Sequence, residues 1–296
     1  MFLLLLFCCS KIKLQINKEG MMKKLILSVF ALAVLSVPAF AGTWVAADRV
    51  ATVGEAMVTK NNLPHKLTFK VVNGAADNST ATTTNIVQIS STELSYAGND
   101  NEVAAVIGTE LGQIINGKAS KDKFRNAAKQ ALREKLAENN ILNTAANSEY
   151  VSTQTTLKDY KLADMTGVDL MINAGYNPLA MVVVITKMPG SNIEIALGKP
   201  SNSERAMSVY NYLTYNYADK VKVGYNCQEY RNFLTYATPI VKKRTSTKRQ
   251  LNKFNKEQEK IKKERAKSLN QYKMSGGMSS WEATYVILNE MTNSKK

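Results

Sequence analysis

Apolar residues return at helical spacing along most of the chain, whereas alternating apolar and polar positions mark only two short segments. The clearest helix is predicted to follow Asn99, whose spacing to Glu102 fits a capping box, and to end at Asn116-Gly117. One face of it is apolar at steps of three and four: Val103, Val106, Ile107, Leu111 and Ile114. Further helices are predicted over residues 44–60, 121–138, 158–174, 178–188 and 205–217.

The two alternating segments predict short strands. Leu67–Val72 precedes the turn dipeptide Asn73-Gly74, and Ile86–Ser90 follows a loop rich in Ser and Thr. Two short strands on either side of such a loop predict a small antiparallel sheet. The fold class expected from the pattern is α+β, mostly helical.

Residues 21–41 have the pattern of an export signal. A short basic region is followed by an apolar run over residues 25–37 and by an A-x-A cleavage site at Ala39–Ala41. We therefore expect residues 21–41 to be a signal peptide and the mature chain to begin at Gly42 in the periplasm or cell envelope.

Residues 1–20 stand in front of this complete signal. Lys18-Glu19-Gly20 can be encoded by a purine run that resembles a bacterial ribosome-binding site. We interpret residues 1–20 as a start-site artefact, so that Cys227 becomes the only cysteine of the mature chain.

The net charge of +15 is concentrated near the C-terminus, because residues 240–296 hold 15 Lys and Arg against 5 Asp and Glu. Residues 244–274 lack Gly and Pro and predict one long basic helix. Its apolar residues fall near one stripe that Gln258 and Arg265 interrupt: Leu251, Phe254, Ile261, Leu269 and Tyr272. This helix either packs a narrow face on the protein, or on a copy of itself, or attaches to an anionic lipid or wall polymer. We expect no nucleic acid partner for an exported protein.

Histidine is scarce enough to limit the metal chemistry. The chain has one His and three Cys, so no site that needs two imidazoles can form within it. That excludes the usual hydrolytic zinc site of a single chain.

The segment Asn101–Gly117 resembles the active-site helix of the HtpX/BepA/CAAX-prenyl-protease family of zinc metallopeptidases, which carries an H-E-x-G-H motif. Ala163–Gly167 and Ala174–Pro178 are similar to the family's second helix, and Lys199-Pro200 with Arg205 is similar to its H-P-x-x-x-x-R segment. The resemblance covers about residues 44–217 in order. It implies a zincin-like metallopeptidase domain over residues 42–217, followed by a helical extension over 218–240 and a basic helical tail over 241–296.

The family's zinc ligands are replaced here. Its two motif histidines and its Glu from the later helix correspond to Thr109, Gln113 and Tyr160, while Glu110 keeps the general-base position and Asp164 a second-helix position. Thr and Gln are neutral, weak donors, and Tyr binds a metal only as a phenolate, whose ordinary pKa is about 10. We therefore expect no zinc, and a pseudopeptidase in which Glu110 and Asp164 are the remaining candidate catalytic residues.

Two alternatives stay open beside the pseudopeptidase. An active metalloendopeptidase would need an unorthodox metal site, for which His65 and Cys227 are the only strong zinc donors of the mature chain. The other alternative is a protein that binds anionic surfaces through its basic tail.

Binding of polypeptide does not require the metal. Enzymes of the resembling family hold an extended peptide against an edge strand by main-chain pairing. The corresponding strand here is Asn85, Ile86, Val87 and Gln88. The expected partner is therefore a polypeptide or an envelope protein.

Overall fold

The computed structural model describes residues 44–64, 67–74, 85–126 and 145–293. The chain divides into the units Met1–Trp44 and Val45–Lys296, and the elements below belong to the second. The signal peptide and the extension predicted over residues 1–41 lie outside the described residues. Among the described residues, none of the helices has the length and apolar character needed to cross a membrane.

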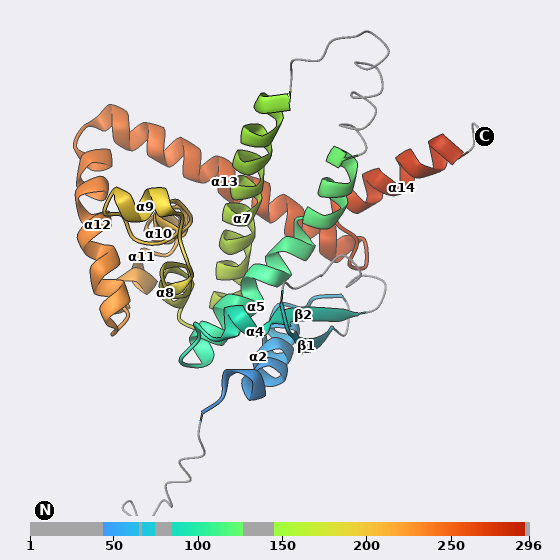
Figure 1. Ribbon diagram of the computed structural model, residues 1–296, viewed down its shortest axis with the longest axis horizontal. Coiled ribbons are helices and arrows are strands. Elements are labelled where there is room, and N and C mark those ends of the chain that lie inside the picture. The colour runs from blue at the N-terminus through green and yellow to red at the C-terminus, as the bar shows by residue number, and fades with distance from the viewer. Residues whose placement is uncertain (1–43, 65–66, 75–84, 127–144, 294–296) are drawn as a thin grey trace, which may run out of the picture. The chain divides into compact units, whose positions relative to one another are not determined.

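The described chain is mostly helical and contains one small sheet (Figure 1). The N-terminal half comprises α2 (Ala46–Lys60), β1 (Thr68–Val72), β2 (Ile86–Ser90), α4 (Ser91–Leu94) and α5 (Asp100–Ile115). The middle comprises α7 (Ala145–Ala174), α8 (Leu179–Lys187), α9 (Asn192–Ala196) and α10 (Ser203–Asn216). The C-terminal part comprises α11 (Ala218–Val223), α12 (Gln228–Thr245), α13 (Lys248–Met274) and α14 (Ser280–Asn293).

The helix α5 forms the centre of the fold. Of its 16 residues, 13 are buried, so the predicted apolar stripe is only part of a helix that is covered on nearly every side. The Asn99 side chain accepts a hydrogen bond from the Glu102 amide at its start, and Gly117, at φ 64°, follows its end. Both predicted ends of this helix are therefore confirmed.

The sheet differs from the prediction, because β1 and β2 run parallel and not antiparallel. Thr68 pairs with Ile86 and Val72 with Ser90. Antiparallel strands can be joined by a short hairpin, whereas parallel strands need a connection of about a dozen residues or more. Residues 73–85 supply a connection of that length, and strand direction cannot be read from the alternation alone.

Two predicted helices differ from the structure in extent. The helix α7 begins at Ala145, whereas its start was expected at residue 158. The polar residues 145–157 contain neither Gly nor Pro, so nothing in them stops a helix. Residues 118–126 are helical, whereas the rest of the helix predicted over residues 121–138 lies outside the described residues.

The predicted basic helix corresponds to α13 and begins at Lys248, where the Thr247 side chain accepts a hydrogen bond from the Gln250 amide. The preceding helix α12 continues past residue 240 to Thr245. In Figure 1, α13 crosses behind α7 and α5, and it makes contacts with both of them.

Candidate functional site

The helices α5 and α7 cross at a point where both backbones lack bulky side chains. Gly108 faces Gly167, and Gly112 faces Ala163 so closely that a Cβ added to Gly112 would lie 2.2 Å from the Ala163 carbonyl oxygen. Glycine permits this approach because it has no Cβ. The crossing brings the residue after Gly108 and the residue after Ala163 together.

Those two residues are Thr109 and Asp164. The Thr109 hydroxyl donates a hydrogen bond to Asp164 Oδ1 at 3.0 Å, and it lies 3.4 Å from the Met181 sulfur. Thr109 is 8% exposed, and Asp164 is fully buried. A buried carboxylate requires strong partners, and the Thr109 hydroxyl by itself would not suffice.

The stronger partner is Arg205 on α10. Its Nε donates to Asp164 Oδ2 at 2.9 Å, and its Nη2 donates to Asp164 Oδ1 at 2.8 Å. The guanidinium also lies 4.9 Å from the centroid of the Tyr160 ring. Burial opposes the charge of Arg205, but the charge and hydrogen bonds of Asp164, together with the nearby Tyr160 and Glu93, outweigh it and raise the Arg205 pKa.

The carboxylate at the general-base position is also engaged. Gln113 Nε2 donates to Glu110 Oε1 at 2.8 Å, and Glu110 is 5% exposed. Glu93 of α4 lies within the electrostatic reach of Arg205 and Asp164, and burial raises its pKa. Glu93 could not be expected at this site from the sequence, because no local pattern indicates which helix its carboxyl faces.

The structure thus joins four of the five residues expected at the site through hydrogen bonds, in the pairs Thr109–Asp164 and Glu110–Gln113. Tyr160 contacts the same network through Arg205. From the sequence, Arg205 was only part of the resembling segment. Its contacts with Asp164 and Tyr160 are found only in the structure. Lys199, from the same segment, is exposed and lies elsewhere.

These residues do not fit a zinc ion. The side chains at the three ligand positions are two neutral donors and a phenol, and the nearby cation Arg205 already neutralises Asp164. Within the part of the chain that the structure describes, no group of three or more His, Cys, Asp or Glu could hold a metal. His65 lies outside the described residues, and Cys227 caps α12, where its sulfur accepts a hydrogen bond from the Tyr230 amide at 3.4 Å.

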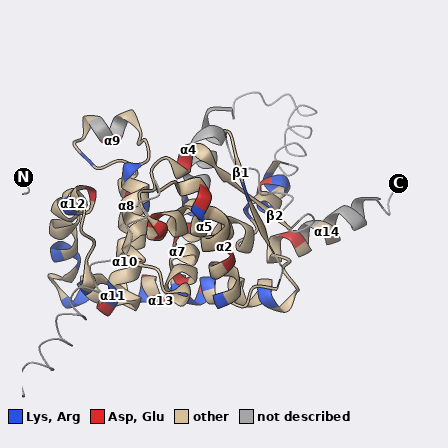
Figure 2. Cartoon of the chain, turned by 90° about the horizontal axis from the view of Figure 1, so that it is seen from below, with Lys and Arg blue, Asp and Glu red and all other residues tan. Residues whose placement is uncertain are grey.

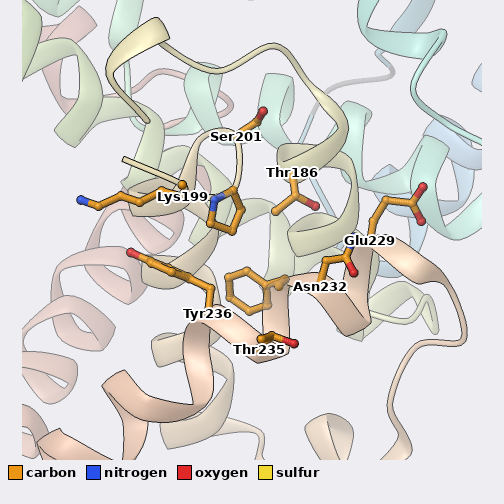
Figure 3. A pocket seen from close by; sticks show the side chains of 10 residues that line it. Thr186, Lys199, Ser201, Glu229, Asn232, Thr235 and Tyr236 are labelled. Atoms are coloured by element: carbon orange, nitrogen blue, oxygen red, sulfur yellow. The ribbon is translucent and has the colours of Figure 1, made fainter. Parts of the chain in front are cut away.

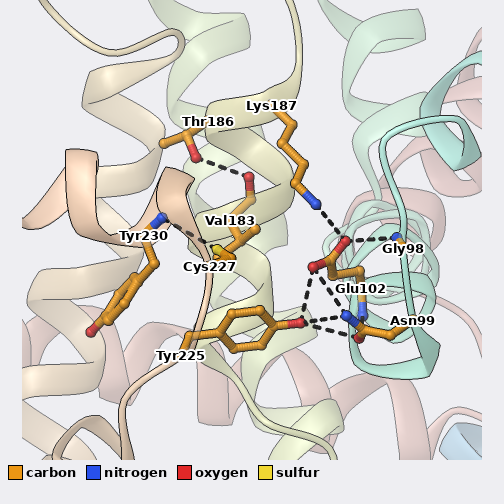
Figure 4. Close-up of polar contacts among 9 residues, drawn as sticks. All are labelled: Gly98, Asn99, Glu102, Val183, Thr186, Lys187, Tyr225, Cys227 and Tyr230. Atoms are coloured by element: carbon orange, nitrogen blue, oxygen red, sulfur yellow. Dashed lines mark hydrogen bonds and ion pairs between the residues drawn. The ribbon is translucent and has the colours of Figure 1, made fainter. Parts of the chain in front are cut away.

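A second polar cluster fixes the start of α5 (Figure 4). The Glu102 carboxylate accepts hydrogen bonds from the Gly98 amide at 2.7 Å and from the Tyr225 hydroxyl at 3.0 Å, and it forms an ion pair with Lys187 at 2.7 Å. Glu102 is 2% exposed, so this buried charge is well partnered. The cluster joins α5 to α8 and to the segment before α12.

A pocket of about 430 Å³ opens between α8, α12 and residues 198–201 (Figure 3). Phe233 contributes an aromatic wall, and polar side chains surround it. The pocket is lined by Thr186, Gly198, Lys199, Pro200, Ser201, Glu229, Asn232, Phe233, Thr235 and Tyr236. None of the five residues expected at the candidate site lines it.

The expected peptide-binding strand corresponds to β2 and the residue before it. Asn85 has φ 57°, a left-handed conformation that Asn tolerates, and its carbonyl accepts a hydrogen bond from the Thr68 amide at 2.6 Å. Val87 is buried, whereas Ile86 is 37% exposed. Among the described residues, β1 is the only strand that pairs with β2.

Comparisons with known proteins add no relationship: no family model, curated protein or solved structure matches this chain.

Proposed function

We propose that this chain is an exported pseudopeptidase that binds extended polypeptide without cleaving it. The observation that carries the loss of cleavage is the set of side chains at the three ligand positions. The Thr109 hydroxyl donates to Asp164, the Gln113 amide donates to Glu110, and the Tyr160 ring lies against Arg205. The guanidinium of Arg205 also occupies both oxygens of Asp164, so this carboxylate does not replace a missing ligand. The resemblance to the HtpX/BepA/CAAX-prenyl-protease family supports this proposal, because the family's ligand positions are the ones that have changed.

Glu110 does not restore hydrolysis by itself. A carboxylate base needs an activated water or a nucleophile, together with donors for the oxyanion. The Gln113 amide that donates to Glu110 is a neutral group and activates no water. The network therefore acts as a structural connection between α5, α7 and α10.

The Ile86 end of β2, where the side chain is 37% exposed, supports polypeptide binding. Because the Asn85 carbonyl is turned toward β1, alternation along a strand turns the backbone groups of Ile86 toward the opposite edge. An extended peptide added along that edge would pair with the Ile86 backbone. Recognition of this kind requires no metal and tolerates many sequences.

The test measures the fluorescence anisotropy of a labelled extended peptide and, by mass spectrometry, its integrity. We expect saturable binding, no cleavage, and a loss of at least about tenfold in affinity when alternate amides of the peptide are N-methylated, because each methyl removes one main-chain donor. Equal binding of the methylated peptide would refute strand addition. Cleavage that a zinc chelator abolishes would favour the alternative, an active metalloendopeptidase.

A pair of variants locates the binding edge on the protein. Ile86→Asp places a charge beside the edge and should weaken binding of the peptide. Val45→Asp, at a similarly exposed apolar position outside the sheet, should leave the peptide affinity unchanged. Equal effects of the two substitutions would show that the peptide binds elsewhere.

A further inference from the structure

The helix α13 rests on the protein through a row of residues seven positions apart. Gln258, Arg265 and Tyr272 are 4%, 3% and 1% exposed. Arg265 forms an ion pair with Asp169 of α7, and its guanidinium lies 4.2 Å from the centroid of the Tyr212 ring of α10. These contacts fix the rotation of α13 about its own axis.

The opposite side of α13 carries six cations, which we call the cationic row. Its members alternate at steps of four and three residues, and all are exposed: Arg249, Lys253, Lys256, Lys260, Lys263 and Lys267. At 3.6 residues per turn, this spacing places them along one line, about half a turn from the buried row. Figure 2 shows Lys and Arg gathered along α13.

The cationic row is long, and none of its six cations forms an ion pair within the part of the chain that the structure describes. At a rise of about 1.5 Å per residue, it extends over about 27 Å. Like charges held in line on a docked helix repel one another, and an anionic surface that lies against them would offset this repulsion.

Met274 continues the row beyond its last cation. It lies seven residues after Lys267, on the same side of the helix, and is 80% exposed. A water-exposed apolar side chain at the end of a basic row suits the boundary between lipid headgroups and acyl chains, whereas a soluble anionic polymer offers it no apolar surface.

We propose that the cationic row docks α13 lengthwise on the surface of an anionic lipid bilayer. Four to eight Lys and Arg on one side of a helix are a recurring binding element for anionic lipids. The attachment is peripheral and electrostatic, and it uses a surface separate from the β2 edge that holds polypeptide.

The test is cosedimentation of the full chain with vesicles of phosphatidylcholine that contain about one-third phosphatidylglycerol. We expect binding that falls as salt rises, and none to phosphatidylcholine alone. The triple variant K256Q/K260Q/K263Q should bind about 100-fold more weakly, since each charge at the surface contributes about fivefold. Gln keeps the helix propensity of Lys, and circular dichroism checks the fold.

The matched control is K248Q/K262Q/K273Q, which removes three charges from the same helix but on another side of it. We expect it to lose less than about fivefold in vesicle binding. Equal losses in the two triple variants would show that net charge acts and not the row, and would overturn the proposal. Binding to soluble polyphosphate with none to the vesicles would overturn it as well, in favour of a polymer, and neither result would bear on the peptide experiment.

Discussion

Arg205 of α10 and Asp164 of α7 form a bidentate ion pair, with donor–acceptor distances of 2.9 and 2.8 Å, in which the carboxylate has no contact with solvent. The pair lies beside Thr109 and Tyr160, two positions that correspond to zinc ligands in the resembling family. It connects two helices that also pack on each other, so removing the pair should first of all lower the free energy of unfolding.

The substitution Arg205→Met should lower the free energy of unfolding by about 3–5 kcal/mol, because it leaves Asp164 buried and charged with only Thr109 as partner. Adding Asp164→Asn should recover part of that loss, since the uncompensated charge disappears. Urea unfolding of both variants and of Asp164→Asn alone measures the coupling. A loss below about 1 kcal/mol for Arg205→Met would show that the pair is not required.

The substitution Gly112→Ala should destabilise the protein although alanine is the better helix former. A Cβ at residue 112 would meet the Ala163 carbonyl at 2.2 Å and force α5 and α7 apart, at a cost of about 1–3 kcal/mol. Gly98→Ala serves as the control, because there the nearest atom is a Glu102 side-chain oxygen at 3.4 Å. Thermal unfolding compares the two, and equal melting temperatures would contradict the close crossing.

Glu93 should make stability depend on pH. Burial, offset only in part by Arg205, raises the pKa of this carboxyl above its ordinary value. As pH rises through the ordinary value, the unfolded chain releases the proton first, so stability falls until the folded carboxyl ionises too. The variant Glu93→Gln, which cannot ionise, should therefore gain stability relative to the native protein between about pH 4 and pH 7. Chemical unfolding at both pH values measures this change, and a constant difference would refute it.

Restored zinc ligands should bind the metal more tightly once the guanidinium of Arg205 is removed. In T109H/Q113H/Y160E the new glutamate would lie next to Arg205, which contacts the Tyr160 ring in the native protein, and the two would pair. Adding Arg205→Met should raise zinc affinity by at least about tenfold, because a like charge leaves the site. Calorimetric titration with zinc compares the two variants. Equal affinities would mean that the charge of Arg205 does not weaken zinc binding.

Arg265 should hold α13 on the protein. Arg265→Met removes the partner of Asp169, which also accepts hydrogen bonds from the Tyr212 and Tyr217 hydroxyls. We expect α13 to open more often and trypsin to cleave it at least about tenfold faster. Lys267→Met, on the exposed side of the same helix, removes one trypsin site and should not accelerate cleavage elsewhere. Similar cleavage rates for the two variants would contradict the anchoring role.

Local patterns were sufficient for the elements whose determinants lie within a few residues of each other. The ends of α5 follow from Asn99 and Gly117, and the end of α7 from Gly175, because caps and left-handed turns depend on neighbouring backbone groups. The spacing from Thr109 to Gln113 likewise put both side chains one helical turn apart. Whether the chain is exported and whether it binds polypeptide stay predictions.

Only the tertiary structure decided the features that depend on partners far along the chain. Strand direction depends on the path of residues 73–85, and the same alternation fits either direction. Gln258 and Arg265 interrupt the apolar stripe of α13 in the sequence, yet they are its most buried side chains apart from Tyr272. Arg265 can be buried because Asp169, on a helix almost a hundred residues earlier, carries the opposite charge. Periodicity describes one helix at a time, and a buried charge is acceptable only when the packing of several helices brings its counter-charge to it.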